Sequence, residues 1–169
     1  DGVTNFYKKK YKYHCNKIYT LQHGFKLDDI KHTNNYIESN IINFSYTGSF
    51  HETCEDSTLR MCNVILSNFN CILHVFGGNN KNKFLEHNIY GDNIIFYDFM
   101  SEESFSEKLK TMQIHLLPHG FYNSKFSKQD IDTIFSTRLI PLLYSGIPIL
   151  SNSPKDAFFS KFLKKNNCS

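Results

Sequence analysis

The chain has 169 residues, which is enough for one domain with a buried core. Hydrophobic residues make up 40% of it and charged residues 21%, a balance that argues against wholesale disorder. The formal net charge of +3 is too small to predict a nucleic-acid partner by itself, and no apolar run is long enough to span a bilayer.

The first part of the chain gives few signals of regular structure. Residues 1–17 are polar, aromatic and basic without a clear period, and we interpret them as an N-terminal linker or tail. A short strand is predicted at residues 18–21, where a domain of residues 18–169 begins, and a loop with a helical turn at residues 26–40. Because the chain begins at Asp1 and not at a methionine, we expect it to be part of a longer, two-domain protein.

From Ile41 onward, short apolar runs alternate with helical patterns. Strands are predicted at residues 41–46, 71–76, 94–96, 114–117 and 147–150. Helices are predicted at residues 54–69, 80–87, 101–112, 137–144 and from Pro154 onward. This alternation is typical of a parallel sheet covered on both faces. The predicted fold is therefore a three-layer, Rossmann-like α/β domain with a mainly parallel sheet.

Some boundaries and faces are predicted in more detail. The helix of residues 54–69 is expected to bury the face formed by Leu59, Cys62, Leu66 and Phe69. The cap of the next long helix is Ser101 or Ser104, and Ser104 is spaced from Glu107 as in a capping box. Residues 119–132 are predicted to form a long polar loop.

The five cysteines are odd in number and irregularly spaced, and none belongs to a CxxC pair. This pattern predicts five free thiols in a reducing compartment, and hence a cytoplasmic protein. His51 and Cys54 lie near one another, but no second pair of ligands follows, so no metal site is expected.

Two groups of lysines lie near the ends of the chain, Lys8–Lys10 and the three lysines Lys161, Lys164 and Lys165. The simplest interpretation is that they form solvated helix or loop surfaces. The alternative is contact with anionic lipid, which would place the protein peripherally at the inner membrane face.

Two strand ends carry candidate ligand-binding residues, because open α/β sheets bind ligands beyond the carboxyl ends of their strands. Gly48 and Ser49 follow the strand of residues 41–46, where a glycine lets backbone amides approach a phosphate. His119 follows the strand of residues 114–117 and offers a hydrogen bond to a phosphate or a sugar hydroxyl. For each of them, the alternative is an ordinary turn or loop residue.

The third candidate is the start of the helix predicted at residues 137–144. Ser136 and Thr137 stand where an N-cap belongs, and Arg138 supplies a forked cationic donor. Hydroxyls, amides and a guanidinium at a helix start suit a diphosphate. The alternative is a simple cap beside a solvated arginine, whose removal would leave thermal stability nearly unchanged.

Residues 135–150 also carry a family resemblance. Their sequence, F-S-T-R-L-I-P-L-L-Y-S-G-I-P-I-L, resembles the donor-domain signature of GT-B fold glycosyltransferases of the retaining "glycosyl transferases group 1" type. The family's two glutamates, eight positions apart, fall on Thr133 and Pro141, neither of which can act as a carboxylate. The resemblance extends along the chain from about Ile18 to Pro154.

The resemblance implies a function for the whole chain. It implies the donor half of a glycosyltransferase, which binds a nucleotide-diphosphate sugar as substrate, without a further cofactor and without nucleic acid. A glycan or lipid-linked acceptor would bind through an N-terminal domain that this chain lacks. In the family, the loop after the strand of residues 94–96 commonly touches the nucleobase, which makes Phe99 a candidate contact. Catalytic residues are not identified.

Two other functions remain open. One is a non-catalytic binding or scaffold module of the same fold, favoured by Thr133 and Pro141. The other is a sugar-nucleotide epimerase, for which the sequence supplies no recognisable catalytic acid. The acidic pairs Glu102–Glu103 and Asp130/Asp132 are interpreted as surface groups.

Overall fold

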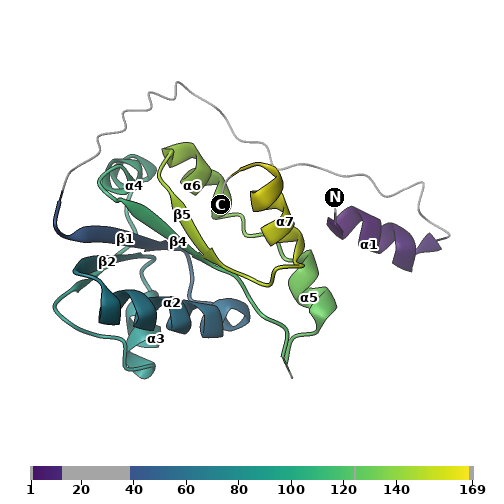
Figure 1. The fold of residues 1–169 in the computed structure, drawn as a ribbon, viewed down its shortest axis with the longest axis horizontal. Coiled ribbons are helices and arrows are strands. Elements are labelled where there is room, and N and C mark those ends of the chain that lie inside the picture. Colours follow the sequence, from purple (N-terminus) through teal and green to yellow (C-terminus); the bar gives the residue numbers. More distant parts are fainter. Residues whose placement is uncertain (1, 13–38, 124, 168–169) are drawn as a thin grey trace.

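The computed structural model describes residues 2–12, 39–123 and 125–167 (Figure 1). Its five strands form one sheet in the order β3-β2-β1-β4-β5. They are β1 (Ile42–Thr47), β2 (Cys71–Phe76), β3 (Ile94–Tyr97), β4 (Ile114–Pro118) and β5 (Ile149–Asn152). Every pair of neighbouring strands is parallel. The predicted α/β fold with a parallel sheet is confirmed.

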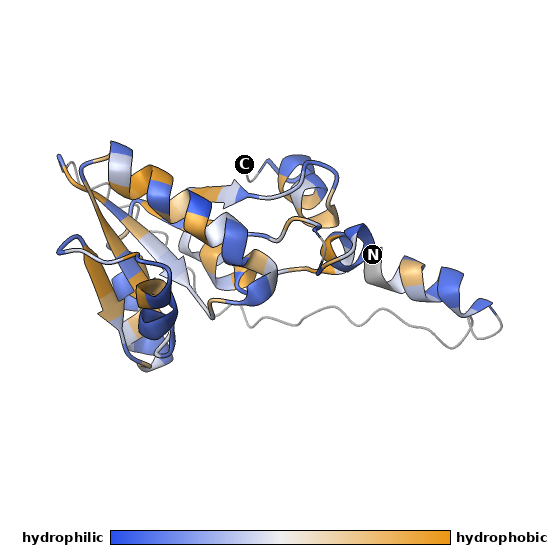
Figure 2. Cartoon of the chain, turned by 90° about the horizontal axis from the view of Figure 1, so that it is seen from below, coloured by the Kyte–Doolittle hydropathy of each residue, from blue (hydrophilic) through white to orange (hydrophobic). Residues whose placement is uncertain are grey.

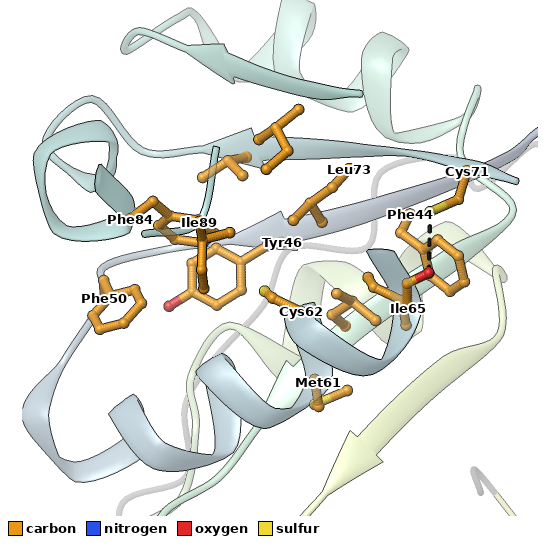
Figure 3. Close-up of a cluster of buried hydrophobic side chains, with 13 residues drawn as sticks. Phe44, Tyr46, Phe50, Met61, Cys62, Ile65, Cys71, Leu73, Phe84 and Ile89 are labelled. Atoms are coloured by element: carbon orange, nitrogen blue, oxygen red, sulfur yellow. Dashed lines mark hydrogen bonds between the residues drawn. The ribbon is translucent and has the colours of Figure 1, made fainter. Parts of the chain in front are cut away.

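Helices cover both faces of the sheet, as alternation along each strand requires. Phe44 and Tyr46 of β1 pack with α2 (Glu55–Asn68) and α3 (Asn80–Glu86) in one buried cluster (Figure 3). On the other face, Phe76 and Leu117 pack with α4 (Glu102–Leu109), α6 (Leu139–Ser145) and α7 (Phe158–Lys165). The two clusters and the sheet between them make the three predicted layers. Figure 2 shows hydrophilic and hydrophobic residues side by side on the helices, as expected for helices with one face in the core and one in solvent.

Helix α2 lies where predicted, but the predicted buried face is partly wrong. Its buried residues are Ser57, Thr58, Met61, Cys62 and Ile65. Leu59 and Leu66 lie at the border of the core, and Phe69 follows the last turn and is 49% exposed. The sheet therefore contacts a stripe centred on small polar and sulfur-containing side chains, which apolar periodicity alone does not indicate.

The predicted caps and loop also need correction. Ser101 caps α4 by accepting from the Ser104 amide, so Ser104 lies inside the helix and forms no capping box with Glu107. The predicted loop of residues 119–132 contains most of α5 (Lys128–Thr133), whose start is a capping box formed by Ser127 and Asp130.

The N-terminal residues form helix α1 (Gly2–Lys10), which contacts α5. No apolar period predicts this helix, because its residues are mainly lysine and aromatic. The strand predicted at residues 18–21, the loop predicted at 26–38, Cys15 and Cys168 lie outside the described residues. Of the cysteines predicted to be free, Cys54, Cys62 and Cys71 are confirmed.

A buried histidine joins the sheet to α6. His115 of β4 is 0% exposed. Its Nδ1 forms a hydrogen bond with the Ser45 hydroxyl of β1, and its Nε2 with the Ser145 hydroxyl at 2.8 Å. Burial lowers the pKa of His115 to about 4, so the ring is neutral at physiological pH.

We expect His115 to make the free energy of unfolding depend on pH. Its folded-state pKa of about 4 lies below the value of 6.5 of an ordinary histidine. As the pH falls below the ordinary value, the unfolded chain therefore binds the proton first. Stability should fall by roughly 3 kcal/mol down to the folded-state pKa and then level off. Denaturant titrations of the wild type and His115→Gln between neutral pH and pH 4 measure this difference, and equal pH dependence in both would contradict it.

Thr47 carries a buried hydroxyl that costs stability. Its side chain is 4% exposed, and its Oγ1 is the one buried side-chain polar atom without a hydrogen-bond partner among the described residues. Thr47→Val keeps the β-branched shape and should raise the free energy of unfolding by about 1–2 kcal/mol. Ser45→Val, the control two residues earlier, should lower it, because it removes the partner of His115. Destabilisation by Thr47→Val would show that the hydroxyl is paired.

Candidate functional site

A pocket of ≈ 530 Å³ lies where the strand order reverses, between the carboxyl ends of β1 and β4. Helix α2, which follows β1, and α6, which lies after α5 in the connection from β4 to β5, lie on opposite faces of the sheet. Their connections therefore diverge and leave a crevice, the usual ligand site of open α/β sheets. The residues that line it are Gly48, Ser49, His51, Thr53, Cys54, Pro118, His119, Gly120, Ile134, Phe135, Ser136, Thr137 and Arg138. Six of the seven residues proposed from the sequence thus meet at one place.

The loop after β1 is held by side chains of β1 and α3. Gly48 has a φ of +84°, a backbone conformation that favours glycine. Its carbonyl accepts a hydrogen bond from Asn80 Nδ2 at 2.7 Å, and the Phe50 amide donates to Asn80 Oδ1 at 2.8 Å. The Tyr46 hydroxyl donates to the Ser49 carbonyl at 3.1 Å. Burial raises the pKa of Tyr46 to about 12, so this donor keeps its proton at physiological pH. The loop is therefore fixed before any ligand binds.

Arg138 lies across this loop. Its Nη1 donates to the Thr47 carbonyl at 3.0 Å, and its Nη2 to the Ser49 carbonyl at 3.5 Å. The guanidinium also lies 5.7 Å from the centre of the Tyr46 ring and packs against Gly48. Burial opposes its charge, but Tyr46 and Cys54 offset this effect and raise the pKa of Arg138. Arg138 is thus a half-buried, charged group at the pocket, and the interpretation as a solvated arginine is wrong.

The start of α6 differs from the prediction. The helix begins at Leu139, with Arg138 as its N-cap, and neither Ser136 nor Thr137 caps it. The Leu139 and Ile140 amides donate to the carbonyls of Ser136 and Thr137, so they are already occupied. The next residue is Pro141, which has no N–H. The positive charge of the pocket therefore comes from Arg138 and not from free amides of the helix start.

His119 is 2% exposed and stacks on Phe159 of α7, with ring centroids 4.9 Å apart. Its Nε2 donates to the Ile131 carbonyl at 3.3 Å. Burial, and then the charge of Arg138, lower its pKa, while the Ile131 hydrogen bond and Asp132 oppose this shift. In the neutral ring with a proton on Nε2, Nδ1 is an acceptor. An acceptor nitrogen can bond a ligand hydroxyl but not an unprotonated phosphate oxygen. Of the two partners predicted for His119, the sugar hydroxyl therefore fits better than the phosphate.

Phe99 is the one proposed residue that does not line the pocket. Its side chain is 83% exposed, and its ring lies over Gly78 at the end of β2. Because the parallel strands end at the same edge of the sheet, Phe99 and the pocket share this edge, two strands apart. Its predicted contact with a nucleobase stays a prediction.

Two further residues shape the pocket: Asn80, which sequence reasoning missed, and Gly120, which follows His119. Asn80 is 3% exposed and holds the Gly48 loop, although it belongs to α3. Gly120 lies directly against the Thr53 backbone. The signal for Asn80 was weak, because an asparagine after two glycines at a helix start is ordinary turn chemistry.

We expect Asn80→Ala to lower the free energy of unfolding by about 2–4 kcal/mol, because it leaves the Gly48 carbonyl and the Phe50 amide without partners. The matched control is Asn79→Ala, since Asn79 is exposed and its side chain makes no capping bond. Denaturant titration compares the two. Similar losses for both variants would show that the asparagine bonds do not hold the loop.

The pocket lining contains one arginine, four hydroxyl side chains and two histidines, and no carboxylate. This set can neutralise an anion and form hydrogen bonds with hydroxyl groups, but it contains no carboxyl group that could act as a general acid or base.

Within the described ranges, no group of three or more His, Cys, Asp or Glu side chains could hold a metal ion. In the same part of the chain, no helix is long and apolar enough to cross a membrane.

Neither a family model nor a curated protein matches the sequence. Among solved structures, the chain matches the apo form of the lipopolysaccharide outer core galactosyltransferase WaaB, with a TM-score of 0.44 and 18% sequence identity. The match covers 72% of this chain and 34% of that one, so this chain spans about a third of that structure. At this identity, the likeness concerns the fold alone.

Proposed function

We propose that this chain is the donor-binding domain of a glycosyltransferase and that its pocket holds the diphosphate of a nucleotide sugar. The observation that carries the proposal is the convergence of Gly48, Ser49, His119, Ser136, Thr137 and Arg138 on one pocket at the strand-order reversal. These residues were selected from the sequence alone, from three separate segments.

The charge and size of the pocket support a diphosphate ligand. Arg138 is the cation, and it has lost part of its hydration, which strengthens its attraction to an anion. Its hydrogen bonds to the Thr47 and Ser49 carbonyls fix its position and leave further N–H donors of the guanidinium for a ligand. A volume of ≈ 530 Å³ lies within the range of small-molecule sites.

The chemistry that follows is electrostatic. In sugar transfer, the bond between the sugar and the diphosphate breaks, and negative charge builds up on the leaving group. A guanidinium held in place before the reaction stabilises that charge without reorganisation. The neutral His119 would accept a hydrogen bond from a sugar or ribose hydroxyl. The glycan or lipid-linked acceptor and a cytoplasmic location belong to this proposal, and free thiols at Cys54, Cys62 and Cys71 fit the location.

One observation favours the scaffold alternative, in which the fold binds no donor. The pocket lining has no carboxylate, and Thr133, at the position of the first family glutamate, uses its hydroxyl to bond the Gln129 and Asp130 carbonyls of α5. Pro141, at the second position, lies inside α6. Loss of a carboxylate that holds ribose weakens donor binding, but it leaves the diphosphate contact of Arg138 intact.

Calorimetric titration with a panel of nucleoside diphosphates, monophosphates and nucleosides tests the proposal. A donor domain should bind at least one diphosphate more tightly than its nucleoside, because the phosphates carry the contact with Arg138. Absence of binding across the whole panel would contradict the proposal and favour the scaffold.

A further inference from the structure

The two terminal helices carry an unusual surface of lysines and exposed aromatic rings. Helix α1 contains Lys8, Lys9 and Lys10, and α7 contains Lys161, Lys164 and Lys165, all of them exposed. Neither helix contains an acidic residue. Tyr7 and Tyr11 are 45% and 46% exposed, and Phe158 of α7 is 37% exposed. We call these nine residues the basic aromatic surface.

The two helices lie at the same end of the molecule. Both contact α5, and Figure 1 shows them beside it, at the end of the molecule away from α3 and α4. The acidic side chains of α5 are already engaged, Asp132 by Lys128 and Asp130 by the backbone and hydroxyl of Ser127. The lysines of α1 and α7 therefore keep their positive charge without a partner of opposite sign from α5.

The spacing on α7 brings charge and apolar surface together. Phe159 and Leu163 face the core and are buried. Phe158 lies three residues before Lys161 and seven before Lys165, so the three side chains share the solvent-facing side of the helix. At the end of α1, the ring of Tyr7 stacks on that of Tyr11, the residue after the helix, with centroids 5.9 Å apart, and the Lys10 ammonium lies 5.6 Å from the Tyr11 ring.

We propose that the basic aromatic surface docks the protein peripherally on an anionic lipid bilayer. Four to eight clustered lysines are typical of surfaces that bind acidic lipids. Exposed phenylalanine and tyrosine between them favour a lipid interface over a nucleic-acid backbone, since amphipathic rings settle at the level of the headgroups. This docking does not depend on the proposed donor site, which lies at the edge of the sheet.

Vesicle flotation tests the proposal. Vesicles of phosphatidylcholine mixed with phosphatidylglycerol should carry the protein, and vesicles of phosphatidylcholine alone should not. Replacing Lys161, Lys164 and Lys165 by Gln should weaken binding about a hundredfold, at roughly fivefold for each lysine. The matched control replaces three exposed lysines away from α1 and α7, namely Lys81 and Lys83 of α3 and Lys110 at the end of α4, and should bind as the wild type does.

A second variant separates lipid insertion from simple charge attraction. Phe158→Ser leaves the net charge unchanged and should weaken vesicle binding severalfold, and thermal melting of each variant confirms that it folds. Equal binding of the two triple-lysine variants would overturn the proposal. So would binding to a DNA duplex in preference to anionic vesicles, with no effect of Phe158→Ser.

Discussion

Replacing Arg138 by alanine should weaken nucleoside diphosphate binding by roughly 10- to 150-fold, the loss expected for a charge-assisted hydrogen bond. Binding of the free nucleoside should change little, because it lacks the phosphates. The variant should also lose about 1–3 kcal/mol of stability, because the guanidinium bonds the carbonyls of Thr47 and Ser49. From the sequence, an unchanged stability was expected only for a solvated arginine, and Arg138 is half-buried.

Two control variants separate these effects. Arg138→Lys keeps the charge but not the fork, so it should recover part of the diphosphate affinity and less of the stability. Arg60→Ala removes an exposed arginine that pairs with Asp56 on α2, and it should alter neither property by more than a small amount. Calorimetric titration and denaturant unfolding give both quantities. Diphosphate affinity unchanged in Arg138→Ala would remove Arg138 from the site.

Gly120→Ala should have the largest effect on stability of any glycine substitution in the pocket. A Cβ at this position would overlap the Thr53 carbonyl oxygen and lie 2.7 Å from Ile131 Cδ1. The backbone after β4 therefore has to move away from the loop before α2, at the base of the pocket. We expect a loss of about 3 kcal/mol, at the upper end of the cost of overpacking, together with weaker ligand binding.

The matched control is Gly78→Ala. There, the added Cβ would meet the Phe99 ring at 2.9 Å, but that ring is 83% exposed and can turn away. Its cost should be small. Thermal melting of the two alanine variants gives the comparison, and a Gly120→Ala protein as stable as the wild type would mean that the contact with Thr53 relaxes easily.

Most of the fold could be predicted because its strands are short apolar runs that end at turn residues. The strand Cys71–Phe76 ends before Gly77 and Gly78, and the prediction matches its bounds. Helices α1 and α5 were missed because their sequences carry few apolar residues in a helical period. Their packing against the rest of the chain is a tertiary effect that periodicity does not report.

The site was predicted in position but not in detail. Strand ends and turn residues pointed to Gly48, His119 and Arg138, which the structure brings to one pocket. The sequence could not show that the Arg138 guanidinium donates to the Thr47 carbonyl at the end of β1, since the two residues are 91 positions apart. Nor could it show that the Leu139 and Ile140 amides are already hydrogen-bonded, so that the start of α6, where Pro141 has no N–H, has few free donors for an anion.

The most direct test of the proposed donor site is a two-dimensional amide NMR titration of the isotope-labelled chain with the tightest-binding nucleoside diphosphate. The proposal predicts that the largest shifts occur at the amides of Gly48, Ser49, His119 and Gly120 and at the Arg138 side-chain N–H, and that the free nucleoside does not reproduce them. Saturable binding with the largest shifts elsewhere, or no shift at the ends of β1 and β4, would contradict it.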